Sequence, residues 1–279
     1  MKNNKFKNLN CIIKNKNFKF LLFFLLSILI FIILFIAVFK IINNKNSLEE
    51  SVLSFANKNE NIIFKIDKCI FFSSADTKNK TASVSNFTIE NLYQYTDMAF
   101  FINNTNSENT LENTLKKLSI SNIQYQFCPE QGEQNLYYKN LNNFAKSDII
   151  DENKINDKLD FLVTSDDTAD FTYPTLYNNC ANPIVLSYIN SNIKTDYTMT
   201  DTGNPLTYNG SLLKRCNVLL SNINCNLSFD IYITNTLDQE FKTTVFVKIP
   251  LQSDDNSISI YDGKYNLKQE TNYIFYRYK

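Results

Sequence analysis

Few residue types in this 279-residue chain could do chemistry, because it contains no His. Nucleophilic sites built on Ser-His-Asp or Cys-His groups are therefore excluded, and so are His-ligated metal sites. The four Gly are scattered and do not make a phosphate-binding loop. The remaining possibilities for catalysis are a carboxylate pair and a Ser-Lys pair.

Acidic residues cluster in two places, one with Asp166, Asp167 and Asp170 and the other with Asp254 and Asp255. Each cluster lies beside Ser, Thr or Asn, as carboxylates in turns usually do. Neither has the alternating acids and central Gly of a Ca²⁺ loop. We interpret both as structural turns, and a carboxylate-based hydrolase is the remote alternative.

A Ser-x-x-Lys spacing occurs at Ser211 and Lys214. This spacing places both side chains on one face of a helix, whereas the segment here precedes a predicted strand. The other motifs of Ser-Lys enzymes are missing. The sequence therefore predicts no catalytic residue, no metal site and no cofactor, and it favours a non-enzymatic protein.

Aromatic side chains are the more promising binding groups, since the chain has 16 Tyr and 23 Phe. Tyr137, Tyr138, Tyr276 and Tyr278 are the candidate binding residues, because exposed rings could stack against sugars. The alternative interpretation is that these rings pack in the core of a sheet or cover it.

The six Cys include one pair that is close in sequence, Cys216 and Cys225. A disulfide between these two would link flanking strands. The alternative is that the thiols act as small core hydrophobes. No C-x-x-C spacing occurs, so a zinc site built on thiolates is not expected.

A membrane anchor is predicted near the N-terminus, where Ser27 is the one polar residue between Phe20 and Phe39. Twenty residues make about 30 Å of helix, which matches the hydrocarbon core of a bilayer. Six Lys precede the run, so the positive-inside rule predicts a cytoplasmic Lys-rich tail over 1–19, a single-pass transmembrane helix over 20–40 and an extracytoplasmic remainder. A cleaved signal peptide is the alternative, although its apolar core usually has only about 7–15 residues.

The remainder of the chain is acidic. Seven of the 28 basic residues and no acid lie in 1–40, which leaves 21 basic and 28 acidic residues, a net charge of −7, over 41–279. Such a charge argues against nucleic acid as a partner. The expected partners are the bilayer, through residues 20–40, and either an envelope protein or a cell-wall glycan.

After a juxtamembrane helix or stalk over 41–59, with helical pattern at 47–58, the sequence indicates β structure. Apolar and polar residues alternate strictly over 223–233 and again over 245–251, as in a sheet with one buried face. Asp262-Gly263 predicts a type I′ hairpin between 258–261 and 264–267. The other predicted strands are 61–72, 84–92, 97–103, 118–127, 159–164, 183–190, 193–200 and 271–278. Such closely spaced strands favour an all-β sandwich.

An internal similarity bears on the number of domains, because residues 97–105 align with residues 228–236. We expect two tandem β modules over 60–128 and 159–279, joined by a linker or long loop over 129–158. A single larger, jelly-roll-like sandwich with two equivalent strands is the alternative, and it would also explain the similarity.

The pattern from Ile231 to Leu251, two strands around Asn-Thr and a polar turn with the second ending in Ile-Pro, resembles immunoglobulin-like repeats. Such repeats occur in surface proteins of Gram-positive bacteria, and two Arg against 26 Lys is similar to the usage of AT-rich genomes. The chain thus resembles uncharacterised single-pass surface proteins of low-GC Gram-positive bacteria with immunoglobulin-like β-sandwich ectodomains. This resemblance implies a membrane-anchored extracellular protein with a binding or envelope-structural role. The alternative is a glycan- or cell-wall-binding module that uses exposed tyrosines.

Overall fold

A computed structural model of the chain describes residues 23–32, 34–35, 62–78, 87–105, 110–126, 131–140, 153–169, 173–199, 206–253 and 255–278. The chain divides into two compact units, 1–61 and 62–279. Within the first unit, residues 23–32 and 34–35 are helical, and their large apolar side chains are exposed.

The expectations for the N-terminal unit fall largely outside the described residues. These include the tail 1–19, the stalk 41–59 with its helix, and the two ends of the apolar run 20–40. In the part of the chain that is described, no helix is both long enough and apolar enough to cross a membrane. The transmembrane helix stays a prediction.

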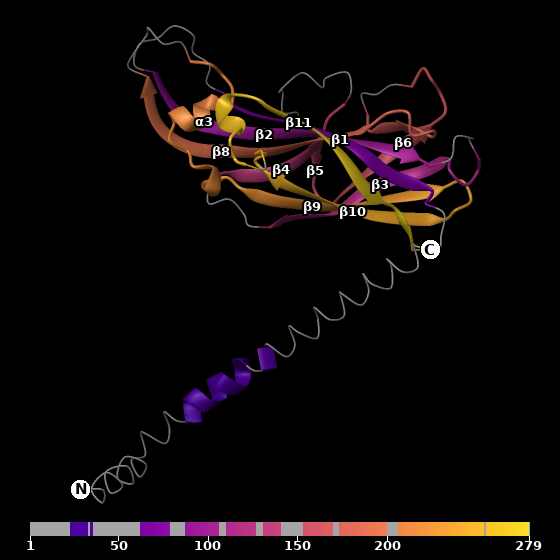
Figure 1. The fold of residues 1–279 in the computed structure, drawn as a ribbon, viewed down its shortest axis with the longest axis horizontal. Helices are drawn as coiled ribbons and strands as arrows, with labels where there is room; N and C mark the ends of the chain where they lie inside the picture. Colours follow the sequence, from indigo (N-terminus) through magenta and orange to yellow (C-terminus); the bar gives the residue numbers. More distant parts are fainter. Residues whose placement is uncertain are drawn as a thin grey trace, which may run out of the picture. The chain divides into compact units, whose positions relative to one another are not determined.

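The second unit is mainly β and contains two six-stranded sheets (Figure 1). We call the sheet with the order β11-β1-β2-β8-β4-β5 sheet A, and the sheet with the order β12-β10-β9-β3-β6-β7 sheet B. Neighbouring strands are antiparallel, except that β6 and β7 are parallel. The strands are β1 (Phe64–Asp76), β2 (Phe87–Asn104), β3 (Leu115–Gln126), β4 (Glu133–Tyr138), β5 (Lys154–Ile155), β6 (Lys158–Thr164), β7 (Thr175–Tyr177), β8 (Ile184–Met199), β9 (Cys225–Asn235), β10 (Glu240–Ile249), β11 (Tyr265–Ile274) and β12 (Tyr276–Arg277). The short helices are α3 (Ser211–Arg215), η3 (Leu220–Asn222) and η4 (Ile260–Asp262).

The two sheets pack face to face around one apolar core, as in a β-sandwich. Phe100 of β2 meets Phe229 of β9 edge to face, with 5.6 Å between ring centroids. Farther along, Tyr138 of β4 contacts Phe161 of β6 in the same geometry at 5.8 Å. The apolar residues that alternate along β9 all point into this core, because the opposing sheet is what buries them.

The expected division into modules over 60–128 and 159–279 is wrong. Sheet A combines β1 and β2 from the first span with β8 and β11 from the second, and residues 62–279 form one compact unit. Residues 129–158 are not simply a linker, since they contain β4 and β5 of the same sheet. The similar segments 97–105 and 228–236 belong to β2 and β9, which are equivalent central strands of the two sheets.

Two long strands are predicted only as separate pieces. The segments 84–92 and 97–103 are both parts of β2, and 183–190 and 193–200 are both parts of β8. Where these strands pair, the register shifts at two points, between Ile89 and Asn91 and between Leu92 and Gln94. Such irregularities change which residues face the core, so the apolar alternation breaks although the strand continues.

The hairpin predicted at Asp262-Gly263 is also wrong. Residues 260–262 form the 3-10 helix η4, and the Ser259 side chain accepts a hydrogen bond from the Tyr261 backbone N–H. The Asp262 carboxylate accepts one from the Ser259 N–H, which completes a capping box. These local hydrogen bonds compete with strand pairing. Gly263, whose φ is 109°, then turns the chain toward β11, which begins at Tyr265.

Candidate functional site

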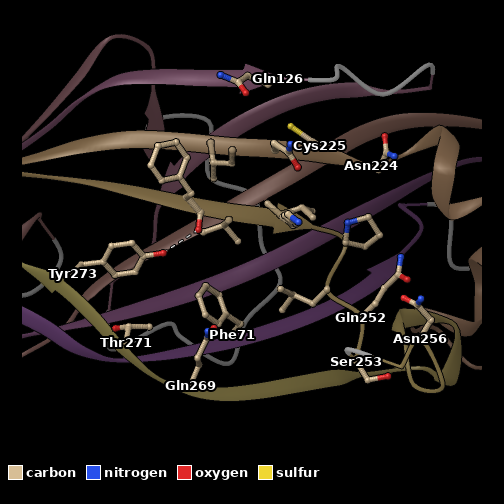
Figure 2. A pocket seen from close by; sticks show the side chains of 18 residues that line it. Phe71, Gln126, Asn224, Cys225, Gln252, Ser253, Asn256, Gln269, Thr271 and Tyr273 are labelled. Carbon is tan, nitrogen blue, oxygen red and sulfur yellow. Dashed lines mark hydrogen bonds between the residues drawn. The ribbon is translucent and has the colours of Figure 1, made fainter. Parts of the chain in front are cut away.

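A cleft of about 870 Å³ lies between the edges of the two sheets, with β10 on one side and β11 on the other (Figure 2). The chain crosses between the sheets at both ends of this cleft. At one end residues 250–264 lead from β10 in sheet B to β11 in sheet A, and at the other end Phe275 leads from β11 to β12 in sheet B. The cleft therefore opens at one side of the sandwich, and a connecting segment lies at each of its ends.

The inner wall of the cleft is apolar. Its residues belong to the main core, and Phe71 of β1 points into the opening (Figure 2). The others are Leu227, Val247, Ile249 and Leu251. These five side chains are at most 7 % exposed, so the apolar surface that a ligand meets first is the Phe246 ring, and burial of this ring favours binding.

The rim of the cleft is rich in side-chain amides, which both donate and accept hydrogen bonds. Lys248 is the one charged side chain among the described residues of the lining, and no carboxylate is among them. The amides are Gln126, Asn224, Asn226, Gln252, Asn256 and Gln269. This lining suits a neutral or acidic ligand with many hydrogen-bonding groups.

Tyr273 bridges the cleft. Its hydroxyl on β11 donates a hydrogen bond of 3.1 Å to the backbone carbonyl of Phe246 on β10 (Figure 2). Burial raises the pKa of Tyr273, so the hydroxyl keeps its proton and remains a donor at neutral pH. The Phe246 ring itself is 65 % exposed beside this bond.

The outer edge of β10 carries few strand partners. In the described part of the chain, β12 is the strand that pairs with this edge, and it reaches only Phe241 and Lys242. From Thr243 to Ile249 no described strand pairs with this edge, and its residues from Phe246 to Ile249 line the cleft. Unpaired backbone groups at a sheet edge are a template for a further strand.

A second, shallower site is a groove of about 320 Å³ on the outer face of sheet B. Tyr232 and Tyr278 line it, with their ring centroids 5.8 Å apart and edge to face. Burial and the nearby carboxylate of Glu240 raise the pKa of Tyr278 to about 12. Two lysines and two carboxylates surround the rings, namely Lys117, Lys158, Asp160 and Glu240.

Of the four tyrosines proposed as a binding platform, Tyr137 and Tyr138 do not fit that role, because both are buried. Tyr138 packs in the main core, and Tyr137 packs with Tyr93 and Ile189 in a separate cluster. Neighbouring residues in a strand point to opposite faces, so both faces of β4 are covered there. No sequence signal distinguishes a strand covered on both faces from a strand with one solvent-exposed face.

The other two tyrosines lie at the edge of sheet B, Tyr276 on β12 and Tyr278 directly after it. Tyr276 is half-buried, and Tyr278 is 45 % exposed in the groove described above. Sequence reasoning therefore found one residue of this groove. It missed the cleft, whose lining comes from strands that are distant in sequence.

Of the two alternatives for Cys216 and Cys225, the disulfide is not formed, and both side chains are thiols. Cys225 starts β9 in the main core, whereas Cys216 belongs to a second apolar cluster around α3. Both are buried, as is Cys69, whose thiol pKa burial raises to about 11. These three cysteines behave as small core residues.

The carboxylates that were considered for catalysis hold turns where they are described. Asp166 accepts hydrogen bonds from the backbone and hydroxyl of Thr168, and these bonds lower its pKa. Hydrogen bonds from Ser253 and Ser257 lower the pKa of Asp255 to about 2. The neighbouring residues 170 and 254 lie outside the described residues.

The Ser-x-x-Lys segment was expected to lie directly before a strand. It instead forms the short helix α3. Ser211 donates its hydroxyl proton to the side-chain oxygen of Asn209 at 2.7 Å, which is a local turn bond. Among the described residues, no three Cys, Asp or Glu side chains gather as a metal site would require.

Comparisons with family models, curated proteins and solved structures found no match for this chain. Its function is therefore inferred from the geometry of the described residues.

Proposed function

We propose that this chain is a non-enzymatic binding protein and that the cleft between β10 and β11 is its binding site. The supporting observation is the cleft itself, which combines an apolar inner wall with a rim of amides. Its volume is in the usual range for ligand sites, roughly 300–1,000 Å³. No carboxylate is among its described lining residues, so acid-base hydrolysis by a carboxylate pair has no support there.

We also propose that residues 20–40 anchor the chain in a membrane, with residues 1–19 in the cytoplasm and the immunoglobulin-like or jelly-roll-like sandwich outside the cell. The apolar run and the placement of the lysines support this orientation. An anchored site stays at the membrane surface, where a high effective concentration makes even weak binding useful.

A glycan is the second candidate ligand, and the groove on sheet B is the observation that favours it. Tyr278 offers a partly exposed ring there, next to Tyr232 and several charged side chains. Aromatic faces with flanking polar groups suit the stacking and hydrogen bonding of a sugar.

Site-specific photocrosslinking in cells tests the cleft. A benzophenone amino acid replaces Phe246, which is 65 % exposed in the cleft, or Leu111, which is 67 % exposed in a distant turn. We expect adducts from the first position and none from the second, and mass spectrometry identifies what is attached. A third position, Tyr278, reports on the groove.

Equal labelling at Phe246 and Leu111, or none at either, would contradict binding at the cleft. Adducts at Tyr278 alone would move the site to the groove. The anchor is tested separately with the full chain: it should resist extraction from membranes by alkaline carbonate, and protease added to intact cells should remove residues 62–279. Extraction into the soluble fraction would refute the anchor.

A further inference from the structure

We infer that the occupant of the cleft is an extended peptide segment of a partner protein, which adds as an antiparallel strand to the outer edge of β10. This inference rests on the proposed function, because it names the ligand class of the same cleft. Four features of the described residues support it: the direction of the β10 backbone groups, the precedent of β12, the lining of the cleft and the bridge made by Tyr273.

The backbone groups of alternate β10 residues point away from β9. The Glu240 carbonyl accepts a hydrogen bond from the N–H of Tyr278, the residue after β12, and the Phe246 carbonyl accepts one from Tyr273. The register with β9 is continuous from Glu240 to Ile249, so the alternation extends to Lys248. In an antiparallel strand the N–H and C=O of one residue point to the same side. Thr244, Phe246 and Lys248 therefore present both groups to the outer edge of β10, and Phe246 and Lys248 do so along the cleft.

β12 shows that this edge accepts an added strand. It pairs antiparallel with Phe241 and Lys242, and then the edge continues for six residues from Thr244 to Ile249. Six residues of strand span about 20 Å. A peptide at this position extends an existing β interface, and its end lies beside Tyr276, the first residue of β12.

The lining of the cleft indicates the side chains that the peptide should carry. Alternate residues of an added strand point into the sandwich, toward Phe71 and Leu251, and the others point to the outer face beside Phe246 and Lys248. The inner positions favour aliphatic residues. The outer positions favour polar or acidic residues, because Lys248 is the one charged side chain that lines the cleft in the described part of the chain.

Tyr273 occupies one of the hydrogen-bonding positions that the peptide would use. Its hydroxyl donates a hydrogen bond to the Phe246 carbonyl, which would otherwise accept one from a backbone N–H of the peptide. A side-chain hydroxyl protects the edge carbonyl while the cleft is empty and is exchanged for the peptide on binding. Removing this hydroxyl should therefore strengthen binding instead of weakening it.

The test measures binding of a fluorescein-labelled hexapeptide, with three valines alternating with threonine, glutamate and threonine, to the full chain in nonionic detergent. Fluorescence anisotropy gives the affinity. The residues opposite Thr244, Phe246 and Lys248 are the polar ones, so their N–H groups face β10. Methylation of these three backbone nitrogens should abolish binding, whereas methylation of the valine nitrogens should have a much smaller effect.

Three variants of the chain complete the test. Lys248→Pro removes one outward N–H while leaving the β9 pairing intact, and we expect about a fivefold to tenfold weaker affinity. Lys248→Gln removes the charge but keeps the N–H, so it should stay closer to the wild type. Tyr273→Phe should bind about fivefold more tightly, since one competing hydrogen bond is gone. Circular dichroism checks that each variant is folded. If Lys248→Pro does not fold, the methylated peptides still test the proposal with the wild-type chain.

Equal binding of the two methylated peptides would overturn strand addition. If the photocrosslinker at Phe246 labels a cell-wall glycan instead of a protein, the peptide is wrong and the binding function stands. If it labels nothing, both the peptide and the proposed function fail.

Discussion

Two aspartates on the central strands of the two sheets show how differently the two outer faces are built. Asp97 on β2 and Asp230 on β9 both point away from the core, and each contacts a lysine, Lys139 at 2.5 Å and Lys242 at 2.9 Å. Nevertheless, the pKa of Asp97 is raised and the pKa of Asp230 is lowered. The same type of ion pair, an aspartate with a lysine, is thus accompanied by opposite shifts of the aspartate pKa in the two sheets.

Burial dominates at Asp97. Its side chain is 4 % exposed and that of Lys139 is 12 % exposed. Loss of hydration raises the pKa of Asp97 more than Lys139 and a hydrogen bond with Ser187 lower it. Burying this pair therefore costs hydration free energy, and each charge is tolerated only because the other one compensates it.

Hydrogen bonds dominate at Asp230. Burial alone would raise its pKa, but donors from the two neighbouring strands, β3 and β10, together more than offset this effect. They are the side chains of Asn122 at 2.6 Å, Thr244 at 2.6 Å and Lys242 at 2.9 Å. Asn122 reaches Asp230 from an irregularity in β3, where its φ of 53° turns the backbone.

The difference corresponds to the exposure of the two faces. On sheet A the ion pair lies next to aromatic side chains, of which Tyr93 and Tyr137 are buried and Phe72 and Tyr95 are half-buried, so water has little access to the pair. On sheet B the network around Asp230 holds Thr244 and Lys242 of β10, the strand whose outer edge forms the proposed site. We interpret the second network as a brace for an edge strand that has few other partners.

Removing the carboxylate of Asp97 should have the largest effect on stability. Asp97→Ala leaves the Lys139 ammonium buried without its compensating charge, and we expect a loss of about 3–5 kcal/mol in the free energy of unfolding. Urea unfolding followed by circular dichroism measures it. Adding Lys139→Met to the same chain should restore most of the loss. A cost below about 1 kcal/mol would show that the pair is hydrated.

Removing the carboxylate of Asp230 should cost less. Asp230→Ala leaves Asn122 and Thr244 without their acceptor, and we expect a loss of about 1–3 kcal/mol by the same measurement. Lys242 can turn to water and adds little. If this variant proves as unstable as Asp97→Ala, the contrast between the two faces is wrong.

The dependence of stability on pH should have opposite signs for the two aspartates. Because the folded-state pKa of Asp97 is raised, ionisation costs stability, which falls as pH rises from the ordinary carboxyl range through the folded-state pKa. Because the folded-state pKa of Asp230 is lowered, its contribution is present above the ordinary range and is lost as pH falls through the folded-state value.

Each slope is at most about 1.4 kcal/mol per pH unit for one proton. Unfolding of the wild type, Asp97→Asn and Asp230→Asn at a series of pH values isolates the two contributions by subtraction. Slopes of the same sign would contradict the assignment.

Removing the lysine on the open face should have the smallest effect. The Lys242 side chain is 38 % exposed, so Lys242→Met should change the free energy of unfolding by about 0–1 kcal/mol. Added salt should reduce the difference further, because water and ions screen the pair. An effect as large as that of Asp97→Ala would mean that Lys242 is buried in solution.

The sequence predicted well those strands with one face in the core and no irregularity. β9 alternates without interruption, and so the predicted span 223–233 closely matches Cys225–Asn235. Strands with irregularities were divided, as in β2, because a shift in register changes which side chains face the core. At Asp262-Gly263 the turn residues were recognised, but the capping box at Ser259 formed a 3-10 helix instead of a hairpin.

The candidate site was much harder to predict than the strands. Phe71, Phe246 and Tyr273 come from three different strands, and their sequence neighbourhoods contain no motif that links them. Buried tyrosines such as Tyr137 were misjudged for a related reason. Period-two alternation reports one buried face, and it does not show whether the other face is also covered.

By itself, the sequence determined that residues 62–279 build mainly β structure, because side-chain alternation is a local property of a strand. It also excluded His-dependent chemistry through composition alone. Only the tertiary structure decided that two predicted modules share one core, and that the edges of β10 and β11 enclose a cleft. Both depend on contacts between segments far apart in sequence, and the pairing of long-range partners is not encoded in any one segment.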